Sequence, residues 1–211
     1  MRSPRSSRSP RTRPSPEVAV PLTIGLTGGI AAGKSEALAA FGRLGAATIS
    51  SDAVVHELLD SEPLQGLLKG RWGDGIAPNG EIDRTMIGEI VFADPEQLKW
   101  LEAQIHPLVG ERIGRWLGSL DDEVRVAVVE VPLLFESEMQ SVFDTTVAVV
   151  TSDEVRRERA EARGHALVGE REARQLGQDE KAARADHVIE NDGTVEDLER
   201  RLSALVAKLG G

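Results

Sequence analysis

The sequence predicts an α/β fold with three layers, in which a parallel sheet is covered by helices on both faces. From Leu22 onward, strand-like and helix-like runs alternate along the chain, as repeated βα units require. The runs Val124–Val131 and Thr145–Val150 are almost continuously apolar, which is typical of parallel strands that are buried on both faces. The length of 211 residues suits a single domain, or one domain that carries a sizeable insertion.

The expected strands, in chain order, are Leu22–Leu26, Ala46–Ile49, Val124–Val131, Thr145–Val150 and His187–Ile189. The helices expected to cover them are Glu36–Leu44, Ala53–Leu59, Asp153–Ala162 and Thr194–Leu209. The last of these helices begins with a clear signal, because Thr194 followed by Asp197 resembles an N-cap residue with an acidic first turn.

Residues 60–120 break this alternation. They contain turn signals at 73–75 and 78–80, followed by helical runs around Arg84–Phe92 and Pro95–Ser119. We therefore expect a mostly helical insertion here, with residues 21–59 and 121–211 forming the core. A second stretch without a strand pattern, at about 163–185, is rich in charged residues, Ala and Gly.

Residues 1–20 are rich in Arg, Ser and Pro, and they carry too little apolar surface to fold. A basic arm or a targeting peptide is one interpretation, although the apolar centre of a signal peptide is missing. A disordered tail, or a start upstream of the true first residue, is the simpler interpretation, and we adopt it.

The charge and composition exclude several classes of protein. Apart from the five arginines of residues 1–16, the chain has 20 basic and 35 acidic residues, so its body would repel a nucleic-acid backbone. No run approaches the roughly 18 apolar residues of a membrane span. The chain has no cysteine, which excludes a disulfide scaffold and is compatible with the cytoplasm. None of the four histidines is spaced from another as in a metal site.

A glycine-rich loop between the first strand and the first helix carries the strongest functional signal. Gly28, Gly33, Lys34 and Ser35 fit the pattern G-x-x-x-x-G-K-[ST] of a phosphate-binding loop (P-loop). Glycines let successive backbone N–H groups converge on phosphate oxygens, and the helix that follows adds unpaired amides. The lysine would reach the β- and γ-phosphates, and the serine hydroxyl would bind Mg²⁺. The G-x-G-x-x-G spacing of a dinucleotide fold is absent.

Two carboxylates follow strands at the edge where open α/β sheets bind their ligands. Asp52 follows the second strand, where it could accept a proton from an attacking hydroxyl; the alternative is that it only caps the helix Ala53–Leu59. Glu130 lies near the end of the third strand, where it could order Mg²⁺ through water, or simply face a basic neighbour. The sequence leaves this second choice open.

Four arginines at positions 156, 157, 159 and 163 load one helix and its end with positive charge. They could neutralise the γ-phosphate during transfer, or they could form a solvated face that is balanced by nearby glutamates. Arg159 and Arg163 share a helical face, and we expect Arg163 to bind phosphate. The guanine-reading motif N-K-x-D and the protein-kinase motifs H-R-D and D-F-G are absent.

Taken together, these residues resemble the dephospho-CoA kinase family over Leu22 to about Leu209. Besides the loop and Asp52, the matching segments are Ile105–Leu108, Val131–Glu136, Arg159 with Arg163, Arg171 with Gln175, and Ala185–Gly193. The resemblance implies a P-loop kinase fold with a CoA-binding insertion at 60–120 and a lid at about 163–185. It also implies transfer of the ATP γ-phosphoryl group to the 3′-hydroxyl of the dephospho-CoA ribose, the last step of coenzyme A synthesis.

The resemblance assigns roles to individual residues. Asp52 would be the base, and Lys34 and Arg163 would act on the phosphates. ATP would contact Gly29, Ala31, Ala32, Gly33, Lys34, Ser35, Glu36 and Asn191, with Asn191 near the adenine and Ser35 on Mg²⁺. We expect dephospho-CoA as the partner, with no nucleic acid or membrane, in a cytoplasmic monomer or weak homo-oligomer.

Three departures from the family pattern are visible. The family usually has G-S-G-K-S-T where this chain has residues 31–36, so Ala31 replaces the first glycine and Glu36 replaces the threonine. Ser50 replaces the first carboxylate of the family's Asp-x-Asp. Ala31 matters if its φ is positive, and Glu36 must point away from a triphosphate. These departures keep open the alternative of an ATP-binding regulatory protein that has lost catalysis. Another small-molecule kinase is a second alternative, against which the insertion and the segment Val131–Glu136 weigh.

Overall fold

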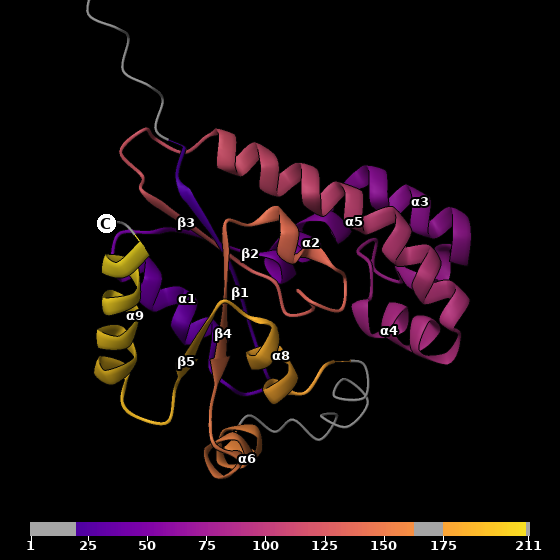
Figure 1. Cartoon of the computed structure of the whole chain (residues 1–211). Helices are drawn as coiled ribbons and strands as arrows, with labels where there is room; N and C mark the ends of the chain where they lie inside the picture. Colours follow the sequence, from indigo (N-terminus) through magenta and orange to yellow (C-terminus); the bar gives the residue numbers. More distant parts are fainter. Residues whose placement is uncertain (1–19, 163–174, 210–211) are drawn as a thin grey trace, which may run out of the picture.

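A parallel sheet forms the centre of the molecule (Figure 1). The computed structural model describes residues 20–162 and 175–209. Within these ranges, five strands pair in the order β2-β3-β1-β4-β5, and every pairing is parallel. The strands are β1 (Leu22–Gly28), β2 (Ala47–Ser50), β3 (Val126–Glu130), β4 (Thr145–Val150) and β5 (His187–Glu190).

One face of the sheet packs against the first and last helices, α1 (Lys34–Arg43) and α9 (Val195–Leu209). Alternation along β3 sorts its side chains between the faces: Val126 and Val128 join this cluster, whereas Val129 lies in the cluster on the opposite face. Phe41 of α1 is fully buried in the first cluster. In α9, Thr194 and Asp197 exchange hydrogen bonds at the N-terminus, as the sequence predicts.

The opposite face is covered by α2 (Ser51–Leu59) and by α8 (Gln178–Arg184), and α2 in turn packs against helices of the predicted insertion. The insertion helices are α3 (Glu62–Trp72), α4 (Arg84–Ala93) and α5 (Pro95–Gly118), with the 3₁₀ turn η1 (Asp74–Ile76) between α3 and α4. A second 3₁₀ turn, η2 (Met139–Val142), precedes β4, and the helix α6 (Asp153–Ala162) follows β4. Figure 1 shows α3, α4 and α5 grouped to one side of the sheet.

The predicted α/β architecture is confirmed, and each predicted strand is present within two residues of its expected ends. The sequence analysis missed α3, and it left α8 inside a stretch without assigned structure. The division into a core and an insertion stays a prediction. Residues 1–19 and most of the predicted lid, 163–174, lie outside the described residues. Within the described part of the chain, no helix is both long and apolar enough to cross a membrane.

Asp186 ties the start of β5 to the start of β4. Its carboxylate accepts hydrogen bonds from the backbone N–H and from the Oγ1 of Thr146, each at 2.8 Å. These bonds, the side-chain bond first, hold the pKa of Asp186 below its ordinary value. The stabilisation is therefore present above the ordinary aspartate pKa of about 4, and it is lost as the pH falls through the folded-state pKa.

We expect Asp186→Asn to lower the melting temperature at pH 7 by roughly 2–4 °C, since about 1 kcal/mol is reasonable for a charged hydrogen bond screened by solvent. Melting curves recorded by circular dichroism at pH 7 and pH 3 test this, and the difference from the wild type should shrink at pH 3. Asp122→Asn, in the exposed turn before β3, is the control. An equal difference at both pH values would contradict the assignment.

Candidate active site

The phosphate-binding loop runs from the end of β1 to the start of α1, and two of its glycines are required by geometry. A Cβ at Gly28 would collide with the carbonyl oxygen of Val149. Gly33 has φ +95°, and a Cβ there would collide with the side-chain amide of Asn191. No side chain caps α1, so the first amides of this helix face the loop without a side-chain acceptor. Such amides are suited to an anion.

Ala31 and Ala32 complete the loop in different ways. Ala31 has φ +61°, the left-handed region where a side chain costs about 1–2 kcal/mol, so replacement of glycine at this position strains the loop. The carbonyl of Ala32 accepts a hydrogen bond from Asn191 Nδ2 at 2.9 Å. Asn191 is only 5% exposed, so its side chain holds the loop from below. The structure therefore places the Asn191 side chain against the backbone of the loop.

The three residues that begin α1 point in different directions. Lys34 Nζ donates to the carbonyls of Gly28 and Gly29, at 3.2 and 3.0 Å, so the ammonium group curls over the loop. The Ser35 side chain is exposed beside it. The Glu36 carboxylate lies 2.7 Å from Arg43 Nη2, so it is turned along the helix and away from the loop. Glu36 could therefore reach a phosphate only through its backbone N–H.

The ends of β2 and β3 bring two carboxylates toward Lys34. Ser50 and Glu130 are paired in register on neighbouring strands, and the Ser50 side chain hydrogen bonds to Glu130. Glu130 is 7% exposed, and this burial raises the pKa of its carboxyl group, while Ser50 and the charge of Lys34 lower it. The charge of Asp52 also raises the pKa of Glu130, which places both carboxylates in one electrostatic cluster.

Asp52 does not cap a helix, so that alternative is wrong. The helix α2 begins at Ser51, its N-cap residue is Ser50, and Asp52 lies exposed in the first turn. The difference arises because the chain turns helical immediately after β2, one residue earlier than a cap at position 52 requires. The carboxylate is therefore open to a molecule that approaches the loop.

A cation and an exposed aspartate lie near the loop on the side of β4 and β5. Arg159 Nη1 is buried without a hydrogen-bond partner among the described residues, and it lies 3.5 Å from the position that a Cβ on Gly33 would occupy. Asp192 accepts hydrogen bonds from Ser152 N at 2.6 Å and Thr151 Oγ1 at 2.7 Å, and these bonds lower its pKa. Arg163 lies outside the described residues.

Sequence reasoning missed one group beside the loop, which comes from α8. Gln178 exchanges two hydrogen bonds with the backbone of Thr151, and its Cβ lies 3.1 Å from the position of a Cβ on Gly29. A cavity of about 140 Å³ lies here, lined by Gly29, Ile30, Arg156, Gln175, Leu176, Gly177 and Gln178. The sequence could not predict this contact, because Thr151 and Gln178 are far apart in the chain.

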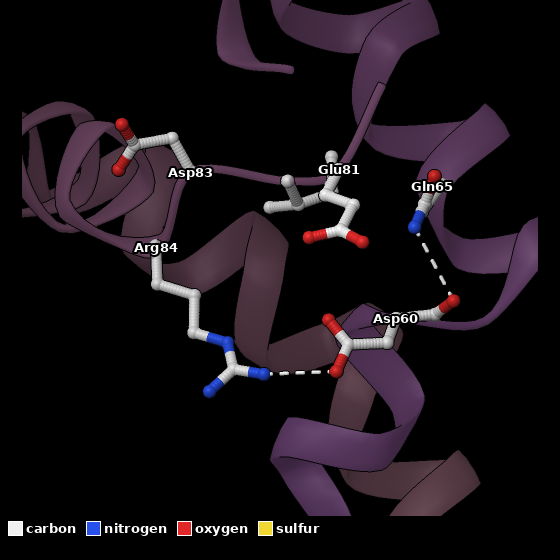
Figure 2. A pocket seen from close by; sticks show the side chains of 6 residues that line it. Asp60, Gln65, Glu81, Asp83 and Arg84 are labelled. Atoms are coloured by element: carbon white, nitrogen blue, oxygen red, sulfur yellow. Dashed lines mark hydrogen bonds and ion pairs between the residues drawn. The ribbon is translucent and has the colours of Figure 1, made fainter. Parts of the chain in front are cut away.

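A larger cavity, of about 550 Å³, lies in the predicted insertion and is lined by Asp60, Gln65, Glu81, Ile82, Asp83 and Arg84 (Figure 2). Figure 2 shows the carboxylates of Asp60 and Glu81 directed into the same space. Arg84 pairs with Asp60 at 2.9 Å, and Asp83 accepts from the first amides of α4. The lining is therefore polar and largely acidic.

The oxygen donors at the loop suit a magnesium ion. Among residues 20–162 and 175–209, no group of three or more His, Asp or Glu residues is placed to hold a metal by itself. The Ser35 hydroxyl and the Glu130 carboxylate supply oxygen donors near the loop. Mg²⁺ prefers such oxygens and usually completes its shell with waters and substrate phosphates, so the residues present fit it.

Comparison with known proteins gives a consistent result. A family model described as dephospho-CoA kinase matches residues 22–197. The chain is 41% identical to the dephospho-CoA kinase of Symbiobacterium thermophilum over 187 residues, which cover 86% of this chain and 78% of that protein. It is 36% identical to the enzyme of Thermosynechococcus vestitus over 196 residues, which cover 90% and 95%.

Solved structures agree with the sequence comparisons. A Thermus thermophilus protein has a TM-score of 0.80 and 37% identity, with coverage of 90% of this chain and 99% of the other. The dephospho-CoA kinase of Campylobacter jejuni has a TM-score of 0.66 and 27% identity, with coverage of 89% and 96%. The shikimate kinase of Acinetobacter baumannii, with a TM-score of 0.51 and 15% identity over 90% and 96%, shares the fold alone.

Proposed function

The chain belongs to the dephospho-CoA kinase family, and on that premise we propose which of its residues carry out phosphoryl transfer from ATP to dephospho-CoA. The observation that carries the proposal is the cluster of Lys34, Asp52 and Glu130 at the mouth of the loop. A cation and two carboxylates lie together at the ends of the central strands, where this fold binds its ligands. The family match and this cluster both weigh against a regulatory protein without catalysis.

In the proposed mechanism, the loop amides and Lys34 bind the ATP phosphates and hold the γ-phosphoryl group in line with the acceptor. Asp52 accepts the proton of the ribose 3′-hydroxyl while the oxygen of that hydroxyl bonds to the γ-phosphorus. The bond between the γ-phosphorus and ADP breaks in the same step. Arg159 donates to the phosphate oxygens, together with Arg163. Asn191 holds the loop in shape below the nucleotide.

Mg²⁺, when bound with ATP, would neutralise charge on the β- and γ-phosphates. Ser35 would hold it directly, and Glu130 would do so directly or through water. The Ser50 hydroxyl donates to Glu130 and so keeps this carboxylate oriented while it is buried. This proposal places the reaction in the cytoplasm, which the absence of cysteine accommodates.

The acceptor is proposed to bind along the insertion, residues 60–120. Helix α2 leads from Asp52 to the cavity at Asp60, a distance of about 12 Å at 1.5 Å per residue. The acidic lining would repel the diphosphate of dephospho-CoA, whereas carboxylates can accept hydrogen bonds from the amide groups of the pantetheine arm. The arm therefore suits this cavity better than the diphosphate does.

A direct test of function is ADP release measured with dephospho-CoA, adenosine and shikimate as acceptors. We expect turnover with dephospho-CoA alone among the three. Turnover with shikimate instead would favour another small-molecule kinase. ATP binding without turnover on any acceptor would favour the regulatory alternative.

Arg84→Ala tests the acceptor cavity, because it removes the cation that pairs with Asp60 in the cavity lining. We expect the KM for dephospho-CoA to rise about three- to tenfold while the KM for ATP stays unchanged, which corresponds to roughly 0.7–1.4 kcal/mol of binding. Arg112→Ala removes a comparable exposed ion pair, with Glu57, and is the control. Equal KM values for dephospho-CoA in the two variants would exclude this cavity as the acceptor site.

A further inference from the structure

A buried ion pair lies behind the phosphate-binding loop, outside the group of residues assigned to the reaction. Lys181 of α8 is 0% exposed, and its Nζ donates to Glu136 Oε1 at 3.1 Å and to the carbonyl of Pro132 at 2.5 Å. Burial lowers the pKa of Lys181, and the bond to Glu136 opposes that shift. The Glu136 side chain is 15% exposed. The lysine cannot touch a substrate, so any role in the reaction is indirect.

The partners of this pair come from three separate parts of the site. Glu136 Oε1 also accepts the backbone N–H of Leu176 at 2.8 Å, just before α8. The Pro132 carbonyl also accepts the Thr27 hydroxyl at 3.2 Å, one residue before the loop glycine that ends β1. Pro132 itself follows Glu130 by two residues. The pair thus joins the start of the loop, the segment after β3 and the segment that leads into α8.

The segment that leads into α8 forms a wall of the nucleotide site. Gln178 lies against Gly29 of the loop and bonds twice to Thr151 at the end of β4. Residues 175–178 line the cavity of about 140 Å³ together with Gly29 and Ile30. A shift of this segment would change the space above the loop amides that receive the phosphates.

Stability alone does not account for the pair. A buried ion pair loses hydration that its attraction rarely recovers, and replacing both members with neutral groups is often neutral or stabilising. The arrangement also leaves Glu136 Oε2 and Gln175 Oε1 buried without hydrogen-bond partners in the described part of the chain. Buried polar atoms without partners are unfavourable, and they call for an explanation other than fold stability.

We propose that Lys181 and Glu136 are positioning residues for ATP binding, which hold residues 175–178 against the phosphate-binding loop. The proposal rests on the assignment of this loop to the ATP phosphates. The proposal predicts a selective effect. Loss of the pair weakens ATP binding, whereas the acceptor site and the carboxylates of Asp52 and Glu130 keep their positions.

The test uses the full chain with Lys181→Met and Glu136→Gln combined, so that no uncompensated buried charge remains. We expect a melting temperature near that of the wild type, a KM for ATP that is raised about tenfold, a kcat lowered less than threefold, and an unchanged KM for dephospho-CoA. Arg184→Ala, which breaks an exposed ion pair with Glu180 on the same helix, is the control and should match the wild type. A folded double variant with the wild-type KM for ATP would overturn the proposal.

Two further measurements keep the test decisive. Gln178→Ala leaves the pair intact and should raise the KM for ATP in the same direction; an unchanged value would contradict the route through this segment, even if the double variant failed to fold. Calorimetric titration with ADP gives the nucleotide affinity without any acceptor. If the wild type bound ADP but did not phosphorylate dephospho-CoA, the proposed function would fail, and the ADP affinities of the variants would still decide the role of the pair.

Discussion

Lys34→Ala is expected to lower turnover by about 10²–10³-fold or more and to leave the fold intact. In the structure, the ammonium group lies on the Gly28 and Gly29 carbonyls, from which it can turn to phosphate oxygens. Its removal deletes a positive charge from the loop, whereas the loop remains held by Asn191 at Ala32. The loss should therefore appear in kcat and in the affinity for ATP, with little change in melting temperature.

Steady-state rates and melting curves measured on the same preparation check this prediction. Lys208→Ala, in the last turn of α9, changes the net charge equally at a distant exposed position and is the control. A rate within tenfold of the wild type would remove Lys34 from its role at the phosphates.

Asp52→Asn is expected to lower kcat by about 10²–10⁴-fold, the usual contribution of a general base, with a KM for ATP within a fewfold of the wild type. The amide keeps the size and exposure of the side chain, so the start of α2 should not change. What is lost is the capacity to accept the hydroxyl proton.

The measurement is kcat at saturating ATP and dephospho-CoA. Glu57→Gln removes another exposed carboxylate from the same helix, one that pairs with Arg112, and serves as the comparison. An unchanged kcat for Asp52→Asn would exclude it as the base, and Glu130, the neighbouring carboxylate, would become the next candidate to replace.

The sheet and the loop were predictable because their signals are local. Continuous apolar runs such as Thr145–Val150 predict buried strands with no knowledge of their neighbours, and the loop motif needs only its own spacing. Helix α3 was missed because Gly66 and Gly70 lower its helical propensity. Leu64 and Leu68 of this helix are buried in a hydrophobic cluster with residues of α2, α4 and α5, and this packing outweighs the low propensity.

The site was predictable only where strand ends determine it. Parallel strands bring Asp52 and Glu130 to the same edge, so both were candidates from the sequence. The environment of Glu130 could not be decided, because its hydrogen-bond partner Ser50 is 80 positions away in the chain and adjacent only in the sheet. The contact of Lys181 with Glu136 is equally long-range, since nothing near Lys181 in the sequence indicates a buried partner.

The strand order has a consequence for how the chain assembles during synthesis. Neither β1 nor β2 pairs with the other, and both require β3, which follows only after the insertion. As the polypeptide leaves the ribosome, β1 and β2, which end at Gly28 and Ser50, therefore have no neighbouring strand until β3 is made, beginning at Val126. The helices α2 to α5 can meet each other sooner through contacts nearer in sequence, which form faster. We expect the helices α2 to α5 to associate first, and the sheet with its phosphate-binding loop to be completed afterwards.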